Sequence, residues 1–154
     1  MKKISALILT MLMVFTIAPF NAFAAEDIVT DSCIEYFEDG SYMVTEITES
    51  SISTFSTSTT KSKNSYYYDN NDNLQWRVTI TGTFNYTGSS ATCTKATTSY
   101  TIYDDAWKVT SAVPSKSGNK ATGTFTVKKY VLGVPLKTIN RTVTITCSNT
   151  GVCS

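Results

Sequence analysis

The residues from Leu74 to Tyr86 alternate between two kinds of side chain, and this alternation constrains the fold more than any other feature of the chain. Bulky apolar residues occupy every second position except Gly82, and polar residues occupy the positions between them. Because successive side chains of a strand point to opposite faces, the pattern predicts a long β-strand with one buried face. The glycine on that face predicts a bulge or bend within the strand.

Shorter segments of the same pattern follow, and turn signals separate them. In 138–147 the alternation places Cys147 on the buried face, and in 92–103 it places Tyr100 there. Asp39-Gly40 marks a hairpin. Repeated short strands predict an all-β fold, an antiparallel β-sandwich of about seven to nine strands that is Ig-like or jelly-roll-like. The other strand candidates are 107–113 and 121–130, and the predicted turns are 69–73, 87–90, 114–120 and 133–135.

Two parts of the pattern stay open. Ser50 to Lys63 is rich in Ser and Thr and is either a linker or an edge strand. The strings 81–84 and 122–125 both read Thr-Gly-Thr-Phe, and 76–79 resembles 107–110. A duplicated strand with an inserted hairpin would explain both repeats, and so would the chance likeness of strands built from Thr, Val and aromatic residues.

The N-terminus has the three parts of a secretory signal peptide. Two lysines precede the uncharged apolar run 4–17, and Ala22-Phe23-Ala24 supplies small residues for cleavage after Ala24. The run is short for a membrane span, and an uncleaved N-terminal anchor is the alternative. We therefore expect residues 1–24 to be removed and 25–154 to be a single secreted domain, with no stable membrane anchor after cleavage.

Four cysteines follow the predicted signal peptide: Cys33, Cys93, Cys147 and Cys153. An even number in an exported chain predicts two disulfides, and the sequence does not distinguish the three ways of pairing four cysteines. We prefer Cys93–Cys147, which would join strands distant in the sequence, with Cys33–Cys153 tethering the chain ends. A metal site is the weaker alternative, because the chain has no Cys-x-x-Cys motif and no histidine.

Charge is divided unevenly along the mature chain. Residues 25–60, an acidic N-terminal segment, contain eight acids and no base, whereas the β core 61–154 contains 11 bases and four acids. One hypothesis is that the basic region binds an anionic envelope polymer or glycan, in one variant only after the acidic segment is displaced from it. The alternative is that the acidic hairpin pairs with the basic strands within the molecule. The candidate contact residues are Lys128, Lys129, Lys137 and Arg141.

Three consecutive tyrosines, Tyr66, Tyr67 and Tyr68, precede the predicted turn at 69–73. In a strand Tyr67 faces away from the other two, so we expect at least one tyrosine on the solvent side. An exposed aromatic side chain there would stack on a sugar or hold a protein partner. The alternative is an aromatic cluster that closes one end of the sandwich.

Few residues point to catalysis. Without histidine the chain has no Ser-His-Asp or Cys-His arrangement. Asp104 and Asp105 are adjacent, so in a strand they would face opposite ways and would not act on one glycosidic bond. The run 69–73 begins like a calcium loop, but Leu74 stands where the loop needs glycine. We expect no catalytic residue, no cofactor, no metal site and, because arginine is rare in an exported chain, no nucleic-acid partner.

Several stretches of the mature chain carry a resemblance to known sequences. They are 35–42, 74–79, 82–86, 88–93, 102–108 and 115–118. Over most of the mature chain these stretches resemble an uncharacterised family of small secreted proteins from Gram-positive, often gut-associated, bacteria. The resemblance implies a secreted bacterial protein and adds no mechanism. Cys93 and Cys147 match the family pattern better than Cys33 and Cys153, which would favour pairing the first two.

These observations favour a secreted binding or surface-interaction protein without catalysis, whose ligand is an envelope or host glycan or another protein. The alternative is a secreted antagonist, such as an inhibitor, immunity protein or toxin-like effector, and a small enzyme is the third reading. A groove lined by Tyr and Asn would favour the glycan binder. An exposed rigid loop such as 129–137 would favour the antagonist, and two facing acids in a cleft would favour the enzyme.

Overall fold

The computed structural model describes residues 28–49 and 57–154, which form eight β-strands and no helix. The predicted signal peptide lies outside these residues. The strands are β1 (Ile28–Tyr36), β2 (Tyr42–Glu49), β3 (Ser58–Tyr68), β4 (Leu74–Tyr86), β5 (Ala91–Ile102), β6 (Trp107–Ser117), β7 (Lys120–Val131) and β8 (Val134–Thr146).

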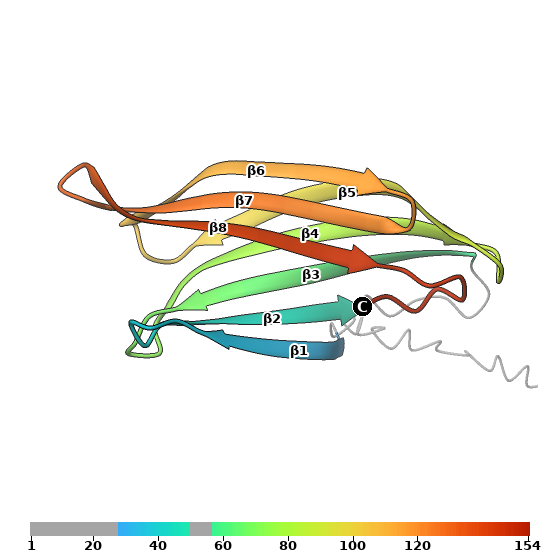
Figure 1. Ribbon diagram of the computed structural model, residues 1–154, viewed down its shortest axis with the longest axis horizontal. Coiled ribbons are helices and arrows are strands. Elements are labelled where there is room, and N and C mark those ends of the chain that lie inside the picture. The colour runs from blue at the N-terminus through green and yellow to red at the C-terminus, as the bar shows by residue number, and fades with distance from the viewer. Residues whose placement is uncertain (1–27, 50–56) are drawn as a thin grey trace, which may run out of the picture.

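The strands form two antiparallel sheets, of five and three strands, that pack against each other (Figure 1). Their orders are β1-β2-β3-β4-β5 and β6-β7-β8, and the smaller sheet packs over β3, β4 and β5. The predicted all-β sandwich is confirmed. Both sheets are meanders in which each strand pairs with its neighbour in sequence, whereas Ig-like and jelly-roll sandwiches contain Greek-key connections.

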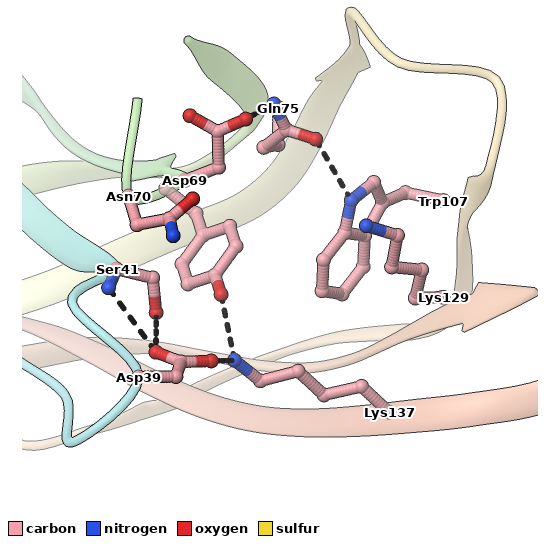
Figure 2. Close-up of a pocket in the computed structure, with 9 residues that line it drawn as sticks. Asp39, Ser41, Asp69, Asn70, Gln75, Trp107, Lys129 and Lys137 are labelled. Carbon is pink, nitrogen blue, oxygen red and sulfur yellow. Dashed lines mark hydrogen bonds and ion pairs between the residues drawn. The ribbon is translucent and has the colours of Figure 1, made fainter. Parts of the chain in front are cut away.

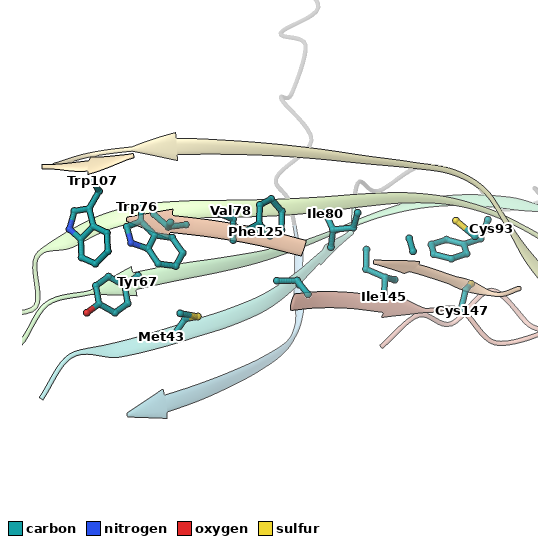
Figure 3. Close-up of a cluster of buried hydrophobic side chains, with 14 residues drawn as sticks. Met43, Tyr67, Trp76, Val78, Ile80, Cys93, Trp107, Phe125, Ile145 and Cys147 are labelled. Atoms are coloured by element: carbon teal, nitrogen blue, oxygen red, sulfur yellow. The ribbon is translucent and has the colours of Figure 1, made fainter. Parts of the chain in front are cut away.

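The core lies between the sheets, and β4 and β7 supply much of it (Figure 3). The predicted strand Leu74–Tyr86 is β4 with the same bounds, and its register against β5 shifts between Thr83 and Phe84, which is the expected irregularity near Gly82. The largest fully buried side chains include Trp76, Phe84, Phe125, Met43, Ile47, Ile80 and Ile145.

The two Thr-Gly-Thr-Phe strings occupy facing strands of the core. A Cβ atom on Gly82 would lie 2.6 Å from the ring of Phe84 and 2.8 Å from Cβ of Ala121 on β7. A Cβ atom on Gly123 would lie 2.8 Å from the ring of Phe125. In each string the phenylalanine ring therefore covers the glycine two residues before it, so the absent side chain makes room for the ring.

Four details of the sequence-based prediction differ from the structure. The predicted turn 133–135 is instead Leu132-Gly133, because Val134 and Pro135 already pair within β8. The predicted turn 114–120 is wrong in its first half: Pro114 lies within β6, an edge strand where a missing N–H is tolerated, and the turn is Gly118-Asn119. Tyr100 is 53% exposed although it has the inward phase of β5. Of the segment 50–63, residues 58–63 belong to β3, which is the central strand of the larger sheet and not an edge strand, and 50–56 lie outside the described residues.

Candidate functional site

The three consecutive tyrosines separate as alternation requires. Tyr67 is buried, stacks on Trp76 with ring centroids 5.1 Å apart, and meets Trp107 edge-on at 5.2 Å. Tyr66 and Tyr68 lie on the opposite, outer face of β3 and are half-buried. Tyr67 thus belongs to an aromatic cluster that closes the end of the core, while its two neighbours lie on the solvent side of β3.

Tyr68 belongs to a row of tyrosines that crosses the outer face of the larger sheet. Tyr36, Tyr42 and Tyr68 are successive cross-strand partners on β1, β2 and β3. The rings of Tyr42 and Tyr68 are stacked, with centroids 4.9 Å apart and an interplanar angle of 7°, and Tyr36 lies 5.7 Å from Tyr42. Tyr36, on the edge strand, is 73% exposed. We call these three residues the tyrosine ladder.

Carboxylates lie beside the tyrosine ladder. Partial desolvation raises the pKa of Tyr42, and a hydrogen bond with Asp72 raises it further. Partial desolvation also raises the pKa of Tyr68, with a smaller contribution from the charge of Glu46. Both phenols therefore stay protonated well above neutral pH. The ladder combines aromatic surface with hydroxyl donors and carboxylate acceptors.

A polar pocket is lined by residues of the turns 37–41 and 69–73 together with residues of the adjoining strands (Figure 2). Lys137 Nζ donates to Asp39 Oδ2 at 2.6 Å and to the hydroxyl of Tyr67 at 2.8 Å. On the opposite wall, Gln75 accepts from Trp107 Nε1 at 3.2 Å and donates to Asp69 at 3.2 Å. The wall groups thus hold one another in place. The lining residues are Asp39, Ser41, Tyr67, Asp69, Asn70, Gln75, Trp107, Lys129 and Lys137.

Both carboxylates of this pocket are fixed in the ionised form. Hydrogen bonds from Lys137 and Ser41 hold the pKa of Asp39 well below its usual range. The backbone N–H of Asn73, with further hydrogen bonds from the turn, lowers the pKa of Asp69. Desolvation lowers the pKa of Lys137, but its hydrogen bonds to Asp39 and Tyr67 outweigh that effect and raise it. The pocket therefore presents fixed charges and hydrogen-bonding groups.

The four predicted basic contact residues do not form one surface. Lys137 pairs with Asp39, and Arg141 pairs with Glu35 at 2.7 Å, so two of the four are partnered by the acidic N-terminal segment. Lys129 lies over the ring of Trp107, 5.8 Å from its centroid, on the inner side of β7. Lys128, the residue before it, lies on the outer side of β7. For Lys137 and Arg141 the structure therefore shows the alternative, in which the acidic hairpin pairs with the basic strands within the molecule.

The predicted calcium-like run has a different role. The carboxylate of Asp69 accepts hydrogen bonds from the backbone N–H groups of Asn71 and Asn73, both at 2.9 Å, so it shapes the β3–β4 turn. Within residues 28–49 and 57–154 no three His, Cys, Asp or Glu side chains group to hold a metal ion. In the same ranges no helix has the length and hydropathy to span a membrane.

Three of the four cysteines lie near one end of the core. Cys93 and Cys147 are buried and reach the core from opposite sheets (Figure 3). Thr146 and Ser154 exchange both backbone hydrogen bonds, so Cys147 and Cys153 form the next cross-strand pair, the kind whose side chains approach most closely. Burial raises the pKa of the Cys93 thiol.

Cys33 lies apart from this group. It is exposed on β1 and lines a groove with Arg141 and Val143 of β8. The structure records Cys33, Cys93 and Cys147 as thiols. Both predicted disulfides therefore stay predictions, and Cys147 has two candidate partners.

Sequence reasoning missed Tyr36 and Tyr42, although Asp39-Gly40 signals the hairpin that joins them. A two-residue Asp-Gly turn would place Tyr36 opposite Met43, whereas in the structure the N–H of Phe37 donates to Ser41 and Tyr36 pairs with Tyr42. The polar pocket had no such signal, because its residues come from strands and turns far apart in the chain. Comparison of the chain with protein-family models, curated proteins and solved structures found no match.

Proposed function

We propose that this protein is a secreted, non-catalytic glycan-binding protein and that the tyrosine ladder is its binding platform. The observation that carries the proposal is the row of Tyr36, Tyr42 and Tyr68, which ends on a side chain that is 73% exposed. Aromatic rings provide flat apolar surface for the C–H face of a sugar, while phenol hydroxyls hydrogen-bond to its hydroxyls. The carboxylates of Asp72 and Glu46 add acceptors beside the rings.

The surroundings of the tyrosine ladder favour a neutral glycan over an anionic polymer. The nearby charges, Asp72 and Glu46, are negative and would repel an anionic chain. Lys137 and Arg141, two of the four basic residues predicted to contact an anionic ligand, are already paired with Asp39 and Glu35. A neutral envelope or host polysaccharide therefore fits this face better.

The polar pocket argues against a glycosidase. It does contain two acids, Asp39 and Asp69. A glycosidase needs one carboxylic acid whose pKa is raised so that it can protonate the leaving group. The pKa values of both acids are instead lowered by hydrogen bonds. Neither would hold the proton that the reaction requires.

The test is retention of the exported protein, purified from culture medium, on isolated bacterial cell walls and on mucin. The wild type is expected to be retained on at least one matrix, with little loss at high salt, because stacking on tyrosine is not an ionic contact. Tyr36→Ala should weaken retention roughly three- to tenfold.

The matched control is Tyr100→Ala, because Tyr100 is 53% exposed and lies outside the tyrosine ladder. Its retention should equal that of the wild type. If the wild type is retained neither on cell walls nor on mucin, the proposal is contradicted. Retention that high salt abolishes would move the binding site to the lysines, and equal loss in both variants would remove the ladder as the platform.

A secreted antagonist is the second candidate, favoured by the exposed β7–β8 hairpin. Leu132 at its turn is fully exposed and Leu136 is 72% exposed. An inhibitory loop would offer such residues to a pocket of a target protein. The tip contains no Trp or Arg, which are the usual anchors of protein interfaces, so the tyrosine ladder carries the proposed function.

A further inference from the structure

The β7–β8 hairpin extends past the neighbouring turns of the sandwich (Figure 1). Tyr130 pairs with Pro135 and Val131 with Val134, and the turn between them consists of Leu132 and Gly133. We call residues 131–136 the apolar tip. The tip is the one place in the described chain where exposed aliphatic side chains follow one another closely. Their exposed fractions are 47% for Val131, 100% for Leu132, 65% for Val134 and 72% for Leu136.

The turn itself does not account for its leucine. Leu132 has φ 51° and Gly133 has φ 81°, and a two-residue turn with both values positive favours Asn-Gly. A leucine at positive φ is unfavourable, and side chains held in such conformations often have a functional role. Because Leu132 is also fully exposed, neither packing nor turn formation explains it. What remains is contact with something outside the molecule.

Lysines surround the base of the same hairpin on both faces. Lys108 pairs directly with Lys128 across β6 and β7, and Lys129 pairs with Lys137 across β7 and β8. Like charges opposite each other destabilise a sheet. Among the residues that the structure describes, Lys137 pairs with Asp39, and the other three lysines form no ion pair. We call these four residues the lysine collar. No acid occurs in the sequence after Lys108.

Tyr130 lies between the apolar tip and the lysine collar. Its ring lies 5.4 Å from Nζ of Lys108, and its backbone N–H donates to Ala106 in the β5–β6 turn. The hairpin thus presents aliphatic side chains first, then an aromatic ring, then cations. This is the order in which peripheral membrane segments meet hydrocarbon, the interfacial region and anionic headgroups.

We propose that the apolar tip inserts shallowly into an anionic lipid bilayer and that Lys108, Lys128 and Lys129 of the lysine collar contact its headgroups. Shallow insertion suits the hairpin because its backbone groups pair across β7 and β8 nearly to the turn. A protein pocket is the less suitable occupant, since the tip offers it no hydrogen-bonding side chain. Such binding is peripheral and reversible. It is separate from glycan binding by the tyrosine ladder.

The test is sedimentation of the exported protein with vesicles of phosphatidylcholine alone and of phosphatidylcholine with 30% phosphatidylglycerol, neither of which contains glycan. The wild type should sediment with the anionic vesicles, and less so as salt rises. Leu132→Asn combined with Leu136→Asn should reduce partitioning at least tenfold. Asparagine suits positive φ, so this variant keeps a turn residue that favours the fold.

The control is Val152→Asn, which removes an exposed apolar side chain, 69% accessible, near the C-terminus. It should sediment like the wild type. Absence of wild-type sedimentation with both vesicles would overturn the proposal and assign the tip to a protein partner. Sedimentation that the double variant leaves unchanged would overturn it too, as would equal binding to neutral and anionic vesicles. Glycan retention by the same preparations tests the tyrosine ladder independently.

Discussion

At the scale of single residues, two glycines set how closely the sheets approach. Gly82 lies against Phe84 and Ala121, and Gly123 lies against Phe125 and Ile80. In each case the space of a methyl group is occupied by an aromatic ring that reaches across its own strand and by a side chain of the facing sheet. The buried glycines are therefore part of the packing between β4 and β7.

We expect Gly82→Ala to lower the free energy of unfolding by about 1 to 3 kcal/mol. The new methyl group would overlap the buried ring of Phe84, so the ring and the nearby backbone would have to shift. Urea unfolding of the variant and wild type measures this difference. Asn85→Ala, at an exposed position of the same strand, is the control and should change little. A Gly82→Ala variant as stable as the wild type would mean that the sheets are less tightly packed here.

The ion pair of Asp39 predicts a dependence of stability on pH. Its pKa in the folded protein lies below the value of about 3.9 expected for an unfolded chain, so the pair stabilises the fold above that value. Its contribution is lost as pH falls through the acid range. Asp39 is about half-exposed, so the contribution at pH 7 is about 1 kcal/mol or less.

Asp39→Asn should therefore be less stable than the wild type at pH 7, and the difference should shrink as pH is lowered from about 4 to 2. Thermal unfolding at a series of pH values measures it. Glu38→Gln, which alters the exposed neighbour, serves as the control. A difference that stays constant across this range would show that Asp39 acts through packing and not through its charge.

At the scale of strands, the sequence predicted where strands occur better than it predicted which strand faces are covered and which strands lie at an edge. Alternation over Leu74–Tyr86 determines which side chains share a face, and the predicted bounds match β4. Alternation does not say whether another layer covers that face, which is why Tyr100 was expected to be buried. Pro114 was read as part of a turn because sequence alone does not distinguish an edge strand from a central one.

The candidate sites follow the same division. The tyrosine ladder depends on the register of two strand pairs, β1 with β2 and β2 with β3, and alternation does not determine either register, so of its three members only Tyr68 was named from the sequence. The polar pocket depends on how the two sheets dock, because Gln75 comes from β4, Trp107 from β6 and Lys137 from β8. Long-range docking of this kind leaves no periodic signal in the chain.

The positions of the cysteines near the strand ends predict which one contributes most to stability. Cys147 lies opposite Cys153 and in the same buried cluster as Cys93, so it could form either the predicted Cys93–Cys147 disulfide or a Cys147–Cys153 disulfide, but not both. We expect Cys147→Ser to lower stability under oxidising conditions by about 4 kcal/mol if the Cys93–Cys147 link forms. Exposed Cys33 lies elsewhere, and Cys33→Ser should have a smaller effect.

Thermal unfolding with and without reductant compares these two cysteine variants with the wild type. Intact mass, measured before and after reduction, counts the disulfides. Equal losses from the two variants would indicate that Cys33 is itself bridged and would support the predicted Cys33–Cys153 link. Wild-type stability that reductant does not change would contradict both disulfides.

At the scale of the whole molecule, the division of charge along the sequence becomes a contact between segments. The acidic residues Glu35 and Asp39 reach across to Arg141 and Lys137 of β8, which joins the uncovered edge of the larger sheet to the smaller sheet. These four charged side chains are therefore paired within the molecule along this edge. Lys108, Lys128 and Lys129 of the lysine collar remain at the base of the β7–β8 hairpin, beside the proposed membrane contact.

The meander order of both sheets has a consequence for how the chain folds. Each strand finds its partner next to it in sequence, and the turns between β6, β7 and β8 contain two residues each. Strand pairing therefore closes short loops, which has a small entropic cost, and only the docking of the two sheets brings distant residues together. Hairpins could form in order as the chain emerges from a ribosome or a translocation channel. The slow step would then be the closing of one finished meander onto the other.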